Sequence, residues 1–139
     1  MRVLFDTNVV LDVLLDREPF AGAAAYLFGR VESSELDAFL CATTLTTIHY
    51  LAAKALDRDR ARLLVKQLLA LFEIAPVNRP ILESATDLGF ADFEDAVLHE
   101  AARHAGVQAI VTRDPKGFAR ASLIVYTPKL LQKALKTLD

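Results

Sequence analysis

Four aspartates stand where a carboxylate can do chemistry: Asp6, Asp92, Asp95 and Asp114. Asp6 and Asp114 follow short apolar runs, while Asp92 and Asp95 are three residues apart and share one face of an expected helix. Carboxylates drawn from distant parts of a chain repel one another, and a divalent cation stabilises such a group most simply. Because these oxygen ligands come without cysteine, the four aspartates predict a Mg²⁺ or Mn²⁺ site.

Each of these acids also has a purely structural interpretation when it is taken alone. Asp6 and Asp92 are of the residue type that caps a helix N-terminus. Asp95 would then be a first-turn acid that complements the helix dipole, and Asp114 before a proline is typical of a turn. It is the combination of the four that favours a functional site.

The order of apolar runs and helical spacings predicts the elements that position these acids. The expected strands cover 3–5, 36–41, 72–77, 107–111 and 123–125, and the expected helices cover 7–14, 19–30, 43–55, 57–71, 81–88, 92–105 and the segment from 128. This alternation predicts a three-layer α/β domain with a mainly parallel sheet of four to five strands. Ligands of such sheets bind outside the carboxyl ends of the strands, where Asp6 and Asp114 are expected.

Hydroxyl and amide side chains stand at the same strand ends. Thr7 or Asn8 is expected to cap the first helix, and Thr43 or Thr44 the third. Thr112 follows the strand expected at 107–111, so its hydroxyl is another polar group expected at these strand ends.

Composition limits the class of protein. The chain has 139 residues, 53% of them apolar and 24% charged, which predicts a single globular domain over residues 1–139. A net charge of -2 excludes a protein that coats nucleic acid through charge alone, but it allows a local site. The single cysteine, Cys41, excludes an internal disulfide and a Cys-rich metal site. With acids at positions 6 and 12 and no long apolar stretch, we expect a cytoplasmic protein without a membrane segment.

Three other kinds of site are not supported by the sequence. His99 and His104 are five residues apart rather than four, so they point to different sides of a helix and do not form a metalloprotease zinc motif. His99 shares the face of Asp95, although a structural or exposed histidine is the better interpretation. The sequence contains no Gly-rich phosphate loop. A receiver-type signalling domain would need a second acid beside Asp6, a phosphoacceptor aspartate after a middle strand and a late lysine, and none of these is evident.

Several segments together resemble the PIN-domain nucleases, a family that includes the toxins of many bacterial toxin–antitoxin pairs. The opening segment 3–15, VLFDTNVVLDVLL, is the most specific, and it is supported by 93–98 (FEDAVL), 110–114 (IVTRD), 44–47 (TLTT) and 125–128 (VYTP) in the same order. The resemblance therefore covers essentially the whole chain. It implies a three-layer PIN-like fold with Asp6, Asp95 and Asp114 as the metal-site acids, supported by Thr7, Asn8 and Thr112.

The sequence departs from this family at one position. Many PIN nucleases carry a glutamate early in the helix after the second strand, where this chain has Thr47, and no acid stands between Asp37 and Asp57. Asp92 beside Asp95 is the expected replacement, whereas Asp12 is a weaker one because it is expected to point away. The alternative is a site that binds metal weakly and catalyses poorly.

The resemblance implies a metal-dependent endoribonuclease, and it allows that enzyme to be the toxin of such a pair. Asp6, Asp95 and Asp114 would be catalytic, and bound cations would activate water for phosphodiester hydrolysis. The partners it implies are an RNA substrate and an antitoxin protein. A catalytically weak or inactive PIN-like module that binds RNA or protein is the alternative class.

Two basic features lie near the expected site. Arg113 is expected either to bind a substrate phosphate or to form a surface salt bridge. Residues 115–139 hold five Lys or Arg and one acid, which suits either an RNA backbone or a solvated helix face. Separately, the Ala- and Leu-rich segment 43–72 carries more apolar positions than one core-facing stripe needs, and this predicts a homodimer contact.

Overall fold

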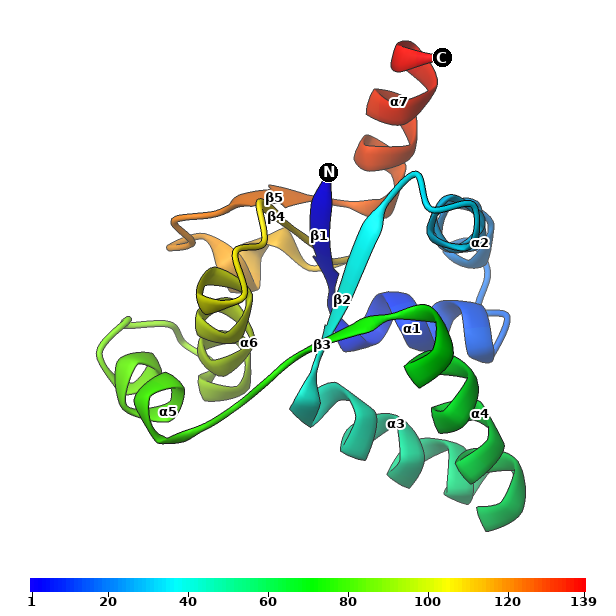
Figure 1. Ribbon diagram of the computed structural model, residues 1–139, viewed down its shortest axis with the longest axis horizontal. Coiled ribbons are helices and arrows are strands. Elements are labelled where there is room, and N and C mark those ends of the chain that lie inside the picture. Colours follow the sequence, from blue (N-terminus) through cyan, green and yellow to red (C-terminus); the bar gives the residue numbers. More distant parts are fainter.

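A five-stranded parallel sheet forms the middle of the protein, as a computed structural model of residues 1–139 shows (Figure 1). The strands lie in the order β3-β2-β1-β4-β5, and every neighbouring pair is parallel. Their bounds are β1 (Arg2–Phe5), β2 (Asp37–Cys41), β3 (Glu73–Ala75), β4 (Ala109–Val111) and β5 (Ile124–Tyr126). The predicted three-layer α/β fold with four to five strands is therefore confirmed.

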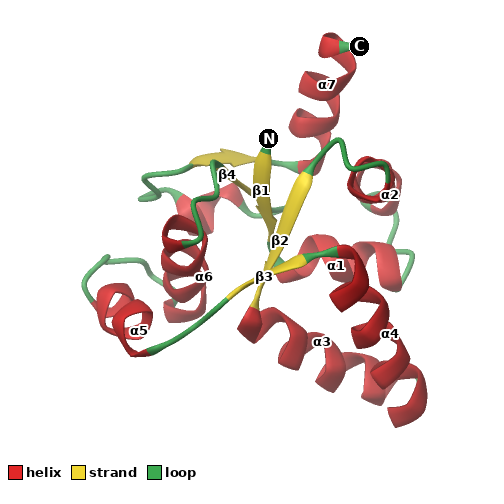
Figure 2. Cartoon of the chain, in the orientation of Figure 1, coloured by secondary structure: helices red, strands yellow, loops and turns green.

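Helices cover both faces of the sheet (Figure 2). They are α1 (Thr7–Leu14), α2 (Ala21–Glu32), α3 (Ala42–Ala55), α4 (Arg58–Leu71), α5 (Arg79–Thr86), α6 (Phe93–His104) and α7 (Pro128–Leu138), with a 3₁₀ turn, η1 (Pro115–Phe118), after β4. One core contains residues of α1, α2, α3, α4 and α7, and the other contains residues of α5 and α6.

The central strand explains why the sequence requires two cores. Val3 and Phe5 pack into one of them and Leu4 into the other, because successive side chains of a strand point to opposite faces. All three side chains are fully buried. A continuous apolar run, rather than an alternating one, is what a strand covered on both faces needs.

The caps of α1 and α3 differ from the Thr and Asn caps expected there, whereas the capping interpretation of Asp6 is confirmed. Asp6 itself caps α1, and its side chain accepts a hydrogen bond from the Thr7 backbone N–H. Helix α3 begins directly after Cys41 without a side-chain cap, so Thr43 and Thr44 lie inside its first turn and the prediction that they cap it was wrong. The reason is that Thr44 is buried and its hydroxyl shares a hydrogen bond of 2.9 Å with that of Thr7.

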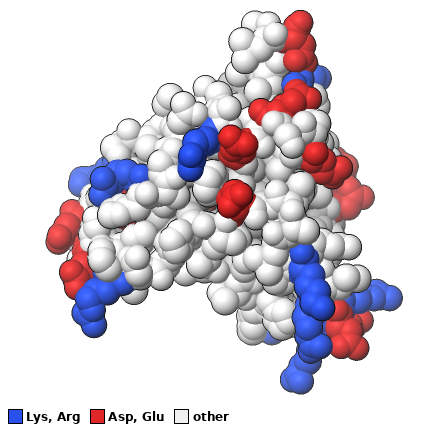
Figure 3. Space-filling model, in the orientation of Figure 1, with Lys and Arg blue, Asp and Glu red and all other residues white.

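Element bounds differ from the predictions by a few residues at most. Helix α2 begins at Ala21 rather than at Pro19, and the 3₁₀ turn η1 was not predicted. None of the helices is both long enough and apolar enough to cross a bilayer. On the face drawn in Figure 3, blue and red side chains occur near the middle as well as at the edges, in keeping with the near-neutral net charge of -2.

Candidate active site

Asp6 is held rigidly at the carboxyl end of β1. One of its carboxylate oxygens accepts the Thr7 N–H at 2.7 Å, and the other accepts the Thr112 hydroxyl at 2.7 Å and the Asn8 amide at 3.3 Å. Because β1 and β4 are neighbours in the sheet, residues 106 positions apart meet here. Burial raises the pKa of Asp6, the bonds from Thr112 and Thr7 oppose that rise, and the pKa stays above its ordinary value.

The loop after β4 is tied to the same residues. The Asn8 side-chain oxygen accepts the Arg113 N–H at 3.3 Å, and the Thr112 hydroxyl accepts the Asp114 N–H at 3.0 Å. The three polar residues that sequence reasoning assigned to supporting roles thus all contact Asp6, and two of them also position the loop that carries Asp114. This arrangement fixes the mutual placement of the first and last acids.

Helix α6 contributes the remaining carboxylates. Asp92 caps α6 and accepts the Asp95 N–H at 3.1 Å. A cavity of about 410 Å³ is lined by all four predicted acids together with Thr7, Asn8, Thr47 and Arg113, and also by Leu11, Arg17, Glu94, Leu98 and Phe118. The structure therefore brings the predicted acids to one cavity, with Thr112 buried behind it.

Gly117 allows two of the acids to approach each other. A Cβ atom on Gly117 would lie 2.8 Å from one oxygen of Asp95 and 3.3 Å from one oxygen of Asp114. The first contact is too short for a carbon and the second is tight, so a larger residue at position 117 would require the Asp95 carboxylate to shift. Sequence reasoning missed Gly117, and its only signal was the placement of a glycine in the short segment between Asp114 and Phe118.

Burial and uncompensated repulsion together dominate the electrostatics of this cavity. Burial, and after it the charges of Asp6, Asp92, Asp114 and Glu94, raise the pKa of Asp95 to about 7. No cation forms an ion pair with any of these acids, although Arg17 and Arg113 line the cavity. Such a donor set, made of hard oxygens with uncompensated charge, fits a divalent cation such as Mg²⁺ or Mn²⁺.

The acids share a cavity without closing around one point. No group of three or more His, Cys, Asp or Glu side chains is arranged to hold a metal ion. Thr47 lines the cavity at the position where many PIN nucleases carry a glutamate, and no other acid takes its place there. The carboxylates of Asp6, Asp95 and Asp114 therefore suit a cation in their chemistry, although their side chains do not surround one point.

Asp12 lies outside this set and has a different function. It is fully buried, its Oδ2 accepts Arg113 Nε at 2.6 Å, and its Oδ1 lies 3.1 Å from Arg17 Nε. The Arg113 guanidinium also lies 4.1 Å from the centre of the Phe20 ring. Of the two arrangements expected for Arg113, the structure shows the salt bridge, and its partner is Asp12. Arg113 also lines the cavity. Sequence reasoning missed Arg17 because its partner is recognisable only in the fold.

His99 points away from the cavity. Its Nδ1 lies 2.9 Å from an oxygen of Glu100, and its Nε2 accepts the Ser122 N–H at 3.1 Å. Burial raises the pKa of the Glu100 carboxyl, but hydrogen bonds from Arg103, Ser84 and His99 outweigh it and lower the pKa to about 2. His99 is a buried structural histidine, as its preferred interpretation required.

The fold and the site define a class: a three-layer α/β protein with an acidic cavity at the carboxyl edge of a parallel sheet. The sequence profile of the PIN domain matches residues 2–116. The chain belongs to the PIN domain family, as the resemblance of its motifs indicated.

Individual relatives extend this likeness over most of the chain. Ribonuclease VapC1 of Aquifex aeolicus is 24% identical over 131 residues, which is 91% of this chain and 90% of that protein. The crystal structure of FitAcB from Neisseria gonorrhoeae is similar at a TM-score of 0.71 and 22% identity, over 91% of this chain and 98% of that one. A toxin–antitoxin complex from Klebsiella pneumoniae is similar at a TM-score of 0.70 and 23% identity, over 91% and 97%. At these identities the two structures establish a likeness of fold.

Proposed function

We propose that this protein is a metal-dependent endoribonuclease that hydrolyses RNA phosphodiester bonds. The observation that carries the proposal is the convergence of Asp6, Asp95 and Asp114 in one cavity without a compensating cation. Membership of the PIN domain family and the likeness to a protein named a ribonuclease support it. The acidic cavity and the likeness to a ribonuclease together favour hydrolysis of RNA over simple binding of RNA.

Each residue of the site has a task in this proposal. Asp6, Asp95 and Asp114, with Asp92 as the fourth acid, would hold Mg²⁺ or Mn²⁺. The bound cation would supply a Lewis acid and lower the pKa of a water molecule. Thr7, Asn8 and Thr112 keep the Asp6 carboxylate in place through the bonds described above. Arg113 is the substrate-binding residue, because it lines the cavity and its guanidinium suits a phosphate.

Cleavage and metal binding test the proposal together. Purified protein should cut single-stranded RNA when Mn²⁺ or Mg²⁺ is present and should give a Mn²⁺ binding isotherm by calorimetry. Asp95→Asn should lose both, whereas Glu83→Gln, an exposed acid of α5, should keep both. A wild-type protein that neither binds Mn²⁺ nor cuts RNA would contradict the proposal.

A second candidate function is a PIN-like module that binds RNA without cutting it. It is favoured by Thr47 in the cavity and by the lack of three acids arranged around one point. This candidate predicts RNA binding that is unchanged by Mn²⁺ and by Asp95→Asn. Calorimetry with Mn²⁺ therefore separates the two candidates.

We also propose that the protein is the toxin of a toxin–antitoxin pair. The support is the solved toxin–antitoxin complex from Klebsiella pneumoniae, whose chain shares this fold. A cytoplasmic location belongs to the same proposal, because a single cysteine suits a reducing compartment. Expression alone should arrest growth, and co-expression of a small protein encoded by the adjacent gene should restore it. Growth that is unaffected by the wild-type protein would count against a toxin.

A homodimer formed through α3 and α4 completes the proposal. These helices and the turn between them expose large apolar side chains, namely Tyr50, Leu51, Leu56, Leu63 and Leu69. Exposed apolar groups that gather on one pair of helices are typical of a protein contact. Light scattering should give a dimer mass for the wild-type protein and a monomer for Leu63→Lys, and a wild-type monomer would remove the dimer.

A further inference from the structure

Three hollows of the surface adjoin one another through shared residues. Arg113 belongs both to the acidic cavity and to a smaller hollow lined by Phe20, Ala23, Thr127, Pro128 and Lys129. Lys129 belongs to that hollow and also to a groove on α7 that is lined by Gln132, Lys133, Lys136 and Thr137. The α7 path is defined here as Arg113, Phe20, Lys129, Lys133 and Lys136. It leads from the carboxylates to the far part of α7.

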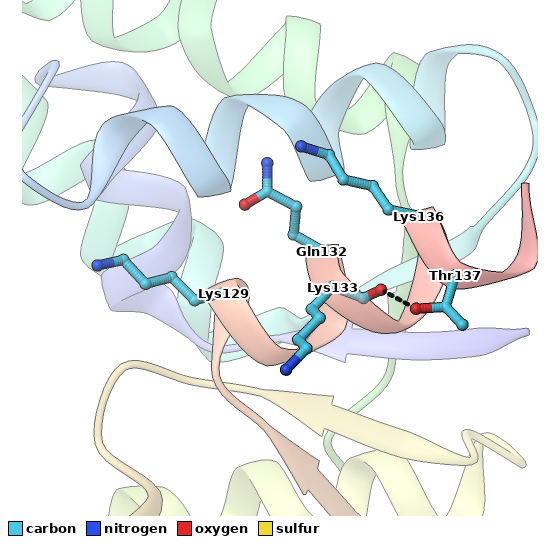
Figure 4. Close-up of a pocket in the computed structure, with 5 residues that line it drawn as sticks. All are labelled: Lys129, Gln132, Lys133, Lys136 and Thr137. Atoms are coloured by element: carbon cyan, nitrogen blue, oxygen red, sulfur yellow. Dashed lines mark hydrogen bonds between the residues drawn. The ribbon is translucent and has the colours of Figure 1, made fainter.

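The lysines of the α7 path carry uncompensated positive charge. Lys129, Lys133 and Lys136 are spaced by four and three residues, which places them along one side of the helix. All three are exposed, and none of the ion pairs of the protein involves a lysine. Figure 4 shows their side chains leaving α7 in different directions, with Lys136 directed toward α2, where its Nζ lies 5.2 Å from the centre of the Tyr26 ring, and Lys133 directed away from it. A polyanion is the chemical complement of such a row.

The beginning of the path combines a cation with an aromatic ring. Phe20 is 38% exposed, and the Arg113 guanidinium lies over its ring. The buried carboxylate of Asp12 holds Arg113 in this position, so the pair is formed before any ligand binds. Aromatic rings and guanidinium planes are the surfaces on which unpaired bases stack. A basic groove that continues from a stacking platform is the arrangement typical of single-stranded nucleic-acid binding.

We propose that single-stranded RNA passes from the acidic cavity over Arg113 and Phe20 and then follows Lys129, Lys133 and Lys136 along α7. The inference rests on the proposed function, because it names the route of the RNA that the acidic cavity would cut. Arg113 and Phe20 position the nucleotide next to the cavity, and the lysines hold the backbone beyond it. Affinity should therefore increase with RNA length until the path is filled.

Fluorescence anisotropy with labelled oligouridylates tests the path. The measurements use Asp95→Asn as the background in every sample, so that the RNA stays intact, with lengths of about 4 and about 12 nucleotides, within the range of known single-strand sites. The test variant replaces Lys129, Lys133 and Lys136 with Gln. The control variant replaces Arg58, Arg62 and Lys66 with Gln, which removes the same charge from exposed positions of α4. Thermal unfolding of both variants checks that they are folded.

The longer RNA should bind the α7 variant about tenfold more weakly than the background protein, and the slope of log affinity against log salt should fall by about 2, as expected for three lost phosphate contacts. The α4 variant should keep both the affinity and the gain with length. Equal losses in the two variants, or an unchanged gain with length in the α7 variant, would overturn the path. If wild-type protein cuts RNA in that case, the proposed function survives, whereas a wild-type protein that neither binds nor cuts RNA overturns both.

Discussion

Asp95 and Glu100 of helix α6 are five residues apart, and their pKa values are shifted in opposite directions. Asp95 faces the cavity among other acids, and burial together with their repulsion raises its pKa to about 7. Glu100 is 1% exposed, yet bonds from Arg103, Ser84 and His99 overcome the cost of burial and lower its pKa to about 2. Burial alone therefore does not separate a site from a structural group, whereas the presence of a partner does.

Asp12 extends the comparison to a third acid. It is as buried as Glu100 but lies beside the cavity, and it is paired with Arg113 and Arg17. Uncompensated charge is costly, and a protein keeps it where a ligand will supply the missing partner. By this criterion we propose the Asp95 cluster as the site, whereas Glu100 and Asp12 hold other groups in place.

The largest expected effect is on catalysis. Asp95→Asn should lower the rate of RNA cleavage with Mn²⁺ about a thousandfold, because it removes a cation ligand from the site. The folded structure should persist, since the substitution also removes repulsion. Initial rates on a labelled single-stranded RNA measure the effect, with Glu83→Gln as the control. A loss below tenfold would remove Asp95 from the catalytic set.

The next effect concerns stability. Glu100→Gln should reduce the free energy of unfolding by about 2 kcal/mol, since it weakens charge-assisted bonds in a buried network, although Arg103 remains half exposed to water. Urea titration at neutral pH measures the change. Glu83→Gln, which removes one partner of an exposed pair with Arg79, should change it by less than about 0.5 kcal/mol. Similar values for the two variants would contradict the structural assignment of Glu100.

Opposite pH trends should follow from Asp95 and Glu100. The folded pKa of Asp95 is raised from 3.8 to about 7, so without a cation its contribution to stability falls as the pH rises through this range. The folded pKa of Glu100 is lowered from 4.5 to about 2, so its contribution is present above about pH 4.5 and is lost as the pH falls toward 2.

Urea titrations in chelator at several pH values separate the two trends. In the wild-type protein the free energy of unfolding should fall by about 1 kcal/mol as the pH rises from 3.8 to about 7, a figure reduced for the partial exposure of Asp95. Asp95→Asn should abolish this fall. Glu100→Gln should abolish the loss of stability that occurs as the pH falls toward 2, and it should leave the fall caused by Asp95 unchanged. A wild-type profile that rises with pH over the range of the Asp95 titration would contradict the first assignment.

The smallest effect is a gain. Thr47→Glu should tighten Mn²⁺ binding about threefold, because it adds a carboxylate to a cavity that Thr47 already lines. Calorimetry with Mn²⁺ measures the change, and Thr46→Glu on the exposed side of α3 is the matched control. Equal affinities for these two variants would show that position 47 is too far from the cation to act as a ligand.

Much of the site was predictable because its signals are local. The run at 3–5 followed by Asp6, and the acids that begin α6, are patterns of adjacent residues, and a parallel sheet brings such strand ends to one edge. The start of α1 was less predictable. Asp6, Thr7 and Asn8 are all suitable helix starters, and Asp6 is held at the cap position by a bond from Thr112, which is remote in the sequence.

Sequence by itself determined the alternation of strands and helices, the buried central strand and the identity of the acids, because periodicity and residue type are properties of short segments. Only the tertiary structure decided which charges are compensated. Asp12 and Arg113 are 101 positions apart, and Gly117 matters only because Asp95 packs against it. Pairing depends on distances of a few ångströms between remote residues, and these distances exist only once the sheet has formed.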